Sequence, residues 1–304
     1  MELVDCLKEH YQWQDAQFIN QAILKTDQGR KRIQYWQDQD ILEWQIEWRD
    51  QCSVTPHVLI DRMIRTKEEE AFIEWKTGWV TVHDDLEDYF TEKGKEEQWG
   101  TLLGAMIEHG QQTKSTVSPR VIAKQKYEDL ELLLPILKSE QRELLTSCLK
   151  EVRFRLNKAD QLKRLVEGIQ PPLMDQVYSV RQAKKVYQVL FWNGTIEAPI
   201  RSYQGIRHLL NYWLHEHGEQ SLGQVLDKMR SHEAFNEHQT MLLLAECLLP
   251  YELNRITEEI HRTDVTDHDI EQAIHFSLVE WERSKKLVSF LSRWFDQQKK
   301  VIPS

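Results

Sequence analysis

Four acidic side chains lie together in one short segment that could hold a divalent cation. Asp84, Asp85, Glu87 and Asp88 are nearly consecutive, and Mg²⁺ prefers carboxylate oxygens as ligands. The segment could instead be a solvated loop or the first turn of a helix, where acidic side chains interact favourably with the helix dipole. The sequence leaves both interpretations open and favours the solvated loop.

The histidines and cysteines lack the spacing of a metal site. His215 and His217 flank Glu216, but residues two apart do not share a helix face, which disfavours a helical zinc site. The four cysteines are scattered without a Cys-x-x-Cys pair, so neither zinc nor a disulfide framework is predicted. Reduced thiols in a cytosolic compartment are the simplest interpretation.

Charge and motif content disfavour several classes of function. Residues 1–110 carry 12 Lys and Arg against 23 Asp and Glu, and such an acidic segment disfavours nucleic-acid binding. No apolar stretch approaches the roughly 18 residues that a membrane span needs, and the first residues lack the pattern of a signal peptide. No Walker loop, Rossmann glycine pattern, Gly-x-Ser-x-Gly turn or His-Glu-x-x-His motif is present. We therefore expect a cytoplasmic protein that binds neither nucleic acid nor membrane.

The apolar pattern divides the chain into a β-rich segment followed by a helical one. In the first 83 residues the pattern predicts strands at 18–26, 31–36, 58–66, 71–75 and 79–83, with one helix at 39–51. Asp61, Arg62 and Arg65 fall on one of these strands and are predicted to form surface ion pairs. Beyond residue 83 a β-prone run at 186–192 ends at an Asn-Gly turn. The predicted helices cover residues 98–109, 121–134, 139–156, 159–167, 202–217, 221–231 and 237–248, then a segment that ends near 262, and finally 267–299.

The last predicted helix carries two apolar groups along its length. Thr266 and Asp269 form a capping-box pattern at its start. Large aromatic side chains seldom face water in a group, so the second apolar group either packs on its own chain or forms a contact with a second copy or with a partner protein. The first group consists of Ile270, Ile274, Leu278 and Trp281, and the second of Leu287, Leu291, Trp294 and Phe295.

Several sequence segments resemble those of the aminoglycoside-phosphotransferase-like kinases. Residues 26–33 (TDQGRKRI) resemble the hairpin between the second and third strands of that fold, and residues 56–61 (PHVLID) resemble the start of its fourth strand. Residues 100–109 (GTLLGAMIEH) are similar to a helix that ends there in Leu-Ala-x-x-His. Residues 242–251 (LLLAECLLPY) look most like the spore-coat branch of this superfamily, the CotS and YutH type.

This resemblance implies an α+β, bilobal kinase-like fold. Residues 1–83 would form a small β-rich N-lobe, and residues 84–304 would form a large helical C-lobe. The predicted boundary falls at the acidic segment that follows the last predicted strand of the first lobe.

The resemblance also implies where a phosphotransferase would carry its site. A strand lysine should hold the nucleotide phosphates, but that place falls at Gln34, with Lys31 and Arg32 displaced from it. The catalytic loop should supply a base and an Asn. Here it offers Asp175, with Val180 where the Asn should be. A second metal-binding Asp should follow a later strand, and that place offers only an Asn.

The loss of all three groups in an acidic lobe predicts a non-catalytic pseudokinase with no cofactor. Such a protein would bind other proteins, with a role in the spore coat or its assembly. The alternative is a divergent small-molecule phosphotransferase that uses Mg·ATP. In that alternative the base would be Asp175, the residues near the nucleotide would be Lys31, Arg32 and Gln34, and the metal ligands would be Asn193, Asp84 and Asp85.

Overall fold

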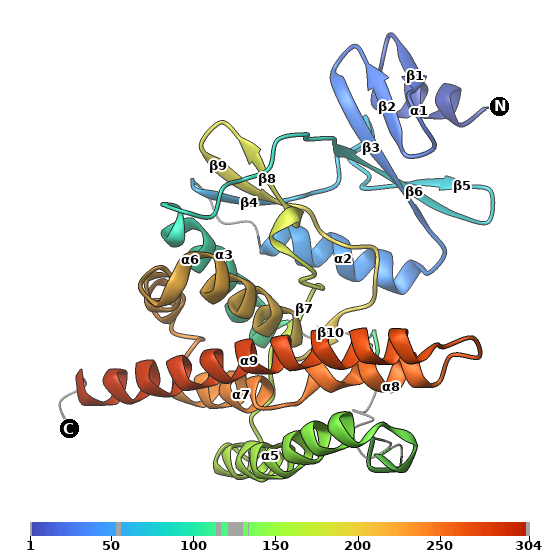
Figure 1. The fold of residues 1–304 in the computed structure, drawn as a ribbon. Coiled ribbons are helices and arrows are strands. Elements are labelled where there is room, and N and C mark those ends of the chain that lie inside the picture. The colour runs from blue at the N-terminus through green and yellow to red at the C-terminus, as the bar shows by residue number, and fades with distance from the viewer. Residues whose placement is uncertain (1, 53–55, 114–116, 121–129, 133, 302–304) are drawn as a thin grey trace. The chain divides into compact units, whose positions relative to one another are not determined.

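The computed structural model of the protein describes residues 2–52, 56–113, 117–120, 130–132 and 134–301 (Figure 1). The chain divides into two compact units, each assembled from separate stretches of sequence. The first unit contains residues 1–120, 172–201 and 224–234, and the second contains residues 121–171, 202–223 and 235–304. The predicted division into residues 1–83 and 84–304 concerns lobes rather than these units, and it stays a prediction.

The first unit is built on a five-stranded antiparallel sheet with the strand order β1-β2-β3-β6-β5. The predicted hairpin at residues 26–33 is present: Thr26 pairs with Gly29, whose φ of +95° suits a residue without a side chain. The strands of this sheet are β1 (Ala16–Phe18), β2 (Ile23–Thr26), β3 (Gly29–Trp36), β5 (Ile73–Trp75) and β6 (Gly78–Asp84).

Different helices cover the two faces of this sheet. Helix α1 (Leu3–Tyr11) packs on one face, where Leu7 and Leu24 share a buried cluster. Helix α2 (Gln39–Gln51) packs on the other face, where Leu42 shares a buried cluster with Trp36. Because side chains alternate along a strand, the even-numbered residues of β3 face α2.

Two smaller sheets and a helix complete the first unit. Strand β4 (Val58–Ile60) pairs in parallel with β9 (Val189–Trp192), and β9 pairs antiparallel with β8 (Ala183–Val186). The predicted strand at 58–66 is therefore too long, because its ladder with β9 ends at Ile60. The remaining elements are helix α3 (Glu96–Gln112), strands β7 (Leu173–Met174) and β10 (Ile200–Arg201), and the 3₁₀ turn η2 (Val180–Gln182).

The second unit is helical. The two helices predicted at 139–156 and 159–167 form one continuous helix, α5 (Ser139–Leu165), because no glycine or proline interrupts the segment between them. Helix α6 (Gln204–Arg230) runs from this unit into the first and is broken at Gly218. The helix predicted at 121–134 lies largely outside the described residues. The other elements are the turns η1 (Leu134–Ile136) and η3 (Tyr251–Leu253) and the helices α7 (Glu237–Cys247), α8 (Asn254–Ile260) and α9 (Asp267–Val301).

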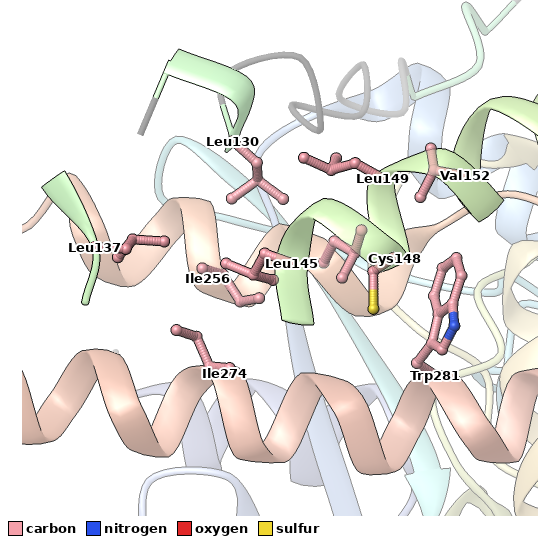
Figure 2. Close-up of a cluster of buried hydrophobic side chains, with 10 residues drawn as sticks. Leu130, Leu137, Leu145, Cys148, Leu149, Val152, Ile256, Ile274 and Trp281 are labelled. Carbon is pink, nitrogen blue, oxygen red and sulfur yellow. The ribbon is translucent and has the colours of Figure 1, made fainter. Parts of the chain in front are cut away.

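Apolar side chains from α5, α8 and α9 form the core of the second unit. Figure 2 shows Leu145 and Cys148 of α5 close to Ile256 of α8 and to Ile274 and Trp281 of α9. Their burial stabilises the packing of these helices, at roughly 25 cal/mol for each Å² of apolar surface removed from water. The complete set of buried members is Leu130, Leu137, Leu145, Cys148, Leu149, Val152, Leu253, Ile256, Ile274 and Trp281.

Helix α9 begins with the predicted capping box and is buried along its second apolar group. The Thr266 amide donates to Asp269, and the Asp269 amide donates back to the Thr266 hydroxyl at 3.2 Å. Among the residues described, no helix is long and apolar enough to cross a membrane. The second apolar group of α9 is at most 6% exposed at every member, Leu287, Leu291, Trp294 and Phe295.

Candidate functional site

A cluster of buried charged side chains lies in the first unit around Asp61. Asp61 is completely buried, forms an ion pair with Arg32 of β3, and lies 3.0 Å from the ring of His83 and 3.5 Å from Arg49 of α2. The prediction that Asp61 forms a surface ion pair is therefore wrong. Its amide donates to the Trp192 carbonyl at 2.8 Å, so the end of β4 is tied to β9 and the carboxylate faces the interior.

Arg32 and Gln34 occupy the face of β3 that is turned toward α2. The pairing of β3 with β6 sets Arg32 opposite His83 and Gln34 opposite Thr81, and cross-strand partners share one face. Lys31 points to the other face, where its ammonium group lies 2.7 Å from the Asp84 carboxylate. Of the three residues predicted to lie near the nucleotide, the fold brings only Arg32 and Gln34 together.

The hydrogen bonds around His83 fit a neutral ring. Its Nδ1 donates to Asp61, and its Nε2 accepts from the Thr81 hydroxyl at 2.9 Å. That hydroxyl oxygen accepts in turn from the Trp36 indole at 2.9 Å, so this assignment of the ring protons satisfies every group in the chain of hydrogen bonds. Burial lowers the pKa of His83, and the nearby arginines add to this effect against the attraction of Asp61.

Asp61 is held in its ionised form by its neighbours. Burial alone would raise the pKa of Asp61, but His83, Arg32 and Arg49 outweigh burial and hold this pKa well below its ordinary value. An unpaired carboxylate at this depth would cost several kcal/mol, so the two arginines are required for the fold as well as for the electrostatics of the site.

Arg49 connects the Asp61 cluster to the segment that follows β9. Its guanidinium donates to the Gln45 amide oxygen at 3.2 Å, to the Asp61 carbonyl at 3.3 Å, and to the Thr195 carbonyl. A Cβ on Gly194 would lie 2.6 Å from the Arg49 Nε. Only glycine therefore lets the guanidinium approach the backbone at this point.

Asp175 directly follows β7 and is 1% exposed. Its carboxylate accepts hydrogen bonds from the Gln45 side chain at 2.9 Å, from the Gln176 amide at 2.8 Å, and from both the amide (2.8 Å) and the hydroxyl of Thr195. These four donors fix the position of the carboxylate. Gln45 binds both Asp175 and Arg49, so the candidate base and the Asp61 cluster form one continuous network.

The three predicted metal ligands do not converge on one site. Asp84 pairs with Lys31, and Asp85 pairs with Arg30 at 2.7 Å. Asn193 follows β9, where its amide donates to the Gln182 carbonyl at 2.9 Å. Within the described part of the chain, no three His, Cys, Asp or Glu side chains are grouped as metal ligands would be.

Four members of the network were not predicted from the sequence. They come from separate elements, and each becomes significant only through a partner far away along the chain. One pattern in the sequence could have pointed to this network. Gln45 and Arg49 stand one turn apart on the helix that also carries Trp44 and Trp48. The four residues are Gln45, Arg49, His83 and Thr195.

The sequence matches no family model, and no curated protein matches it. The solved structures do give matches. An aminoglycoside phosphotransferase from Alicyclobacillus acidocaldarius subsp. acidocaldarius DSM 446 superposes with a TM-score of 0.69 at 14% identity, covering 98% of this chain and 97% of the other. The chain has a kinase-like fold. A spectinomycin phosphotransferase solved with ADP and spectinomycin gives a TM-score of 0.51 at 12% identity over 92% of this chain and 98% of the other.

These matches confirm the predicted fold class and correct the prediction about cofactors. The kinase-like α+β fold, with its antiparallel sheet and helical part, is shared with the aminoglycoside phosphotransferases. The expectation of no cofactor is contradicted, because spectinomycin phosphotransferase has been solved with ADP and with AMP. At 12–14% identity these matches show the fold, and both predicted functions stay predictions. The likeness to the spore-coat branch stays a prediction.

Proposed function

We propose that this protein is a divergent small-molecule phosphotransferase that uses Mg·ATP. The observation that carries the proposal is the position of Asp175. It follows the short strand β7, in the segment where the sequence resemblance implies a catalytic loop, and hydrogen bonds from Gln45, Gln176 and Thr195 hold its carboxylate. Phosphoryl transfer depends mainly on positioning and on charge stabilisation, and this network provides an acceptor for a proton together with fixed cations.

Arg32 and Gln34 are the side chains best suited to contact the nucleotide. Arg32 is a permanent cation on the strand where a phosphate-binding cation is expected. Gln34 has a buried amide oxygen without a hydrogen-bond partner in the described structure. Such an oxygen is uncommon in a folded protein, and a nucleotide amino or hydroxyl group would supply the missing donor.

The residues that the structure describes do not form a metal cage. Asp84 and Asp85 are already paired with basic side chains, and Asn193 offers one neutral oxygen at most. Mg²⁺ commonly binds through substrate phosphates and water with few protein ligands, so it would arrive with ATP.

Asp175 would act as the general base. A substrate hydroxyl would give its proton to this carboxylate while its oxygen forms a bond to the γ-phosphorus, and the bond from that phosphorus to ADP breaks. One carboxylate oxygen must first exchange a hydrogen bond from Thr195 or Gln45 for the substrate hydroxyl. The remaining donors would keep the carboxylate in place during this exchange.

The hydrogen bonds of Asp175 also favour a second candidate function. All four of its acceptor interactions are satisfied within the chain, which suits a protein that binds nucleotide without transferring phosphate. Such a protein would act through partner proteins, and a place in the cytoplasm or the spore coat would suit it. These partners and this location stay proposals.

Nucleotide binding and transfer can be measured on the full chain. We expect Mg·ATP to raise the melting temperature, because a ligand at 100 times its dissociation constant stabilises the folded state by about 2.7 kcal/mol. We also expect slow ATP turnover that hydroxyl-bearing acceptors accelerate. Asp175→Asn should lower this turnover by about 100-fold or more, since that is the usual contribution of a general base.

Asp88→Asn is the matched control, because Asp88 is an exposed acid of the same unit. It should leave both measurements unchanged. If the wild type binds Mg·ATP but shows no ATP turnover, the result would support the second candidate function, nucleotide binding without phosphate transfer. If Mg·ATP at millimolar concentration neither shifts melting nor turns over, the proposed function is wrong.

A further inference from the structure

Arg49 lies between Asp61 and Asp175, two buried carboxylates of the first unit. Its side chain is completely buried, and its hydrogen-bond partners all belong to this unit. Burial lowers the pKa of Arg49, the negative charges of Asp61 and Asp175 act against this effect, and the charge of Arg32 adds to it. The guanidinium is therefore attracted toward both carboxylates at once.

The guanidinium divides its donors between these two sides. Its Nη1 faces Asp61, whose carbonyl oxygen lies at 3.3 Å and whose carboxylate lies at 3.5 Å. Its Nε and Nη2 face the opposite side, where they donate to the Gln45 amide oxygen at 3.2 Å and to the Thr195 carbonyl. The ion pair with Asp61 is longer than a charge-assisted hydrogen bond of about 2.8 Å. A shift of the guanidinium toward Asp61 would therefore shorten the ion pair and lengthen the other two contacts.

The two residues that Arg49 contacts on the opposite side are also residues that hold Asp175. Gln45 donates to the Asp175 carboxylate from the same amide group whose oxygen accepts from Arg49. Thr195 donates to this carboxylate through its amide and its hydroxyl. Of the donors to Asp175, only the Gln176 amide comes from a residue that Arg49 does not contact. A movement of Arg49 therefore changes how firmly Asp175 is held.

Asp61 has two arginine partners, and one of them is the proposed phosphate contact. Arg32 forms an ion pair with Asp61. Phosphate oxygens that bind Arg32 would compete with Asp61 for its single positive charge. A buried carboxylate requires a counter-charge, so Arg49 would move closer to Asp61. The same movement would take it away from Gln45 and Thr195.

We propose that Arg49 is a positioning residue that couples nucleotide binding at Arg32 to the release of Asp175. When nucleotide phosphates bind Arg32, Arg49 shifts toward Asp61 and its two contacts on the Asp175 side weaken. The Asp175 carboxylate can then exchange one of its hydrogen bonds for the hydroxyl of the acceptor. The nucleotide therefore binds before the acceptor. This inference rests on the proposed function, because it assigns a regulation to the same site.

Gln45→Met tests the coupling through nucleotide affinity. The variant removes the amide oxygen that accepts from Arg49, so the shift of Arg49 breaks one hydrogen bond fewer. Linkage between the two sites then requires tighter nucleotide binding. Calorimetric titration of the full chain with Mg·ATP should give a dissociation constant about fivefold lower than that of the wild type, which corresponds to about 1 kcal/mol. In a purely structural role, loss of this buried contact would leave the affinity unchanged or weaken it.

Gly194→Ala shifts Arg49 without removing any polar group. The new Cβ would lie 2.6 Å from the Arg49 Nε and 2.7 Å from its Nη2. Both atoms belong to the side that faces away from Asp61, so the methyl group would push the guanidinium toward Asp61. This variant should also bind Mg·ATP at least about twofold more tightly than the wild type.

Gln51→Met is the matched control for the first variant. Gln51 is exposed on the same helix, α2, where its side chain donates to Glu47, and its replacement should leave the affinity unchanged. Circular dichroism checks that each variant is folded. Reciprocity between the sites gives a further measurement on the wild type alone. Mg·ATP should speed the hydrogen exchange of the Thr195 amide, which donates to Asp175.

The outcomes separate the coupling from the proposed function. If Mg·ATP does not bind the wild type, both are wrong. If Mg·ATP binds but neither variant binds it more tightly, the coupling alone is wrong. Hydrogen exchange of the Thr195 amide that Mg·ATP leaves unchanged or slows would also overturn the coupling.

Discussion

At the scale of single residues, the site depends on charges that are buried and neutralised within the first unit. Asp61 faces two arginines and a neutral histidine, and each of these four side chains comes from a different element or loop. Removing one charged partner leaves a buried charge without compensation, which typically costs about 3–5 kcal/mol, a large part of the roughly 5–15 kcal/mol that stabilises a native protein. A change in the protonation of a side chain in this network is therefore expected to change the free energy of unfolding.

Stability should fall as the pH is lowered below about 6.5. The pKa of His83 is lowered in the folded state from an ordinary value of 6.5, so below that pH the unfolded chain binds a proton that the folded chain does not. The free energy of unfolding then decreases by up to about 1.4 kcal/mol per pH unit for this group. Urea unfolding at pH 7.5 and at pH 5.5 measures the change.

His83→Gln isolates the contribution of this ring. The wild type also loses stability through His208, because burial lowers the pKa of this histidine to about 4. The variant should lose less stability than the wild type between the two pH values, by on the order of 1 kcal/mol. An equal loss in both proteins would mean that His83 is protonated in the folded state.

At the scale of elements, the break in α6 depends on one glycine. Gly218 has φ +79° and ψ 178°, a conformation that only glycine adopts readily. The sequence pattern predicts two helices here, 202–217 and 221–231, and the structure places the break between them. The break therefore lies at a position where any side chain would strain the backbone.

Alanine at two glycines of α6 should have opposite effects. Gly218→Ala should lower the free energy of unfolding by about 1–3 kcal/mol because the backbone becomes strained. Gly223→Ala should raise it by about 0.5–1 kcal/mol, because Gly223 is helical and its new Cβ would be 3.9 Å from the Phe290 ring. Chemical denaturation of both variants measures the difference. Equal effects would contradict the role of Gly218 conformation.

At the scale of the whole molecule, the C-terminal helix stabilises the single chain. Trp294 and Phe295 are 5% and 6% exposed without a second copy of the protein. Packing on the same chain is therefore enough to explain the burial of Trp294 and Phe295. The homodimer through this helix stays a prediction.

Truncating these two aromatic side chains should lower stability without changing mass. Trp294→Ala and Phe295→Ala should each lower the free energy of unfolding by about 3–5 kcal/mol, since each leaves a cavity. Light scattering should give the same mass as for the wild type. Phe154→Ala is the control, because Phe154 is 68% exposed on α5 and should change little. A halved mass for either α9 variant would show that these residues hold a dimer.

The sequence alone determined the features that depend on neighbours along the chain. Apolar periodicity predicted the helices α2, α3, α7 and α9. The spacing of Thr266 and Asp269 predicted the capping box, and the likeness of residues 26–33 to a family hairpin predicted the Thr26–Gly29 turn. These features form from residues a few positions apart, so their signals are local. The resemblance of short segments to kinase-like proteins added the fold class, which the solved structures confirm.

The tertiary structure decided which polar residues meet. Asp61 and its partners are surface residues by type, and they become a buried network only because β3, α2, β4 and β6 converge. The parallel pairing of β4 with β9 joins segments separated by more than 100 residues, and no local pattern encodes such a pair. Burial of a charge requires partners that arrive from distant segments, so the sequence could name Asp175 but could not reveal the four hydrogen bonds that hold it.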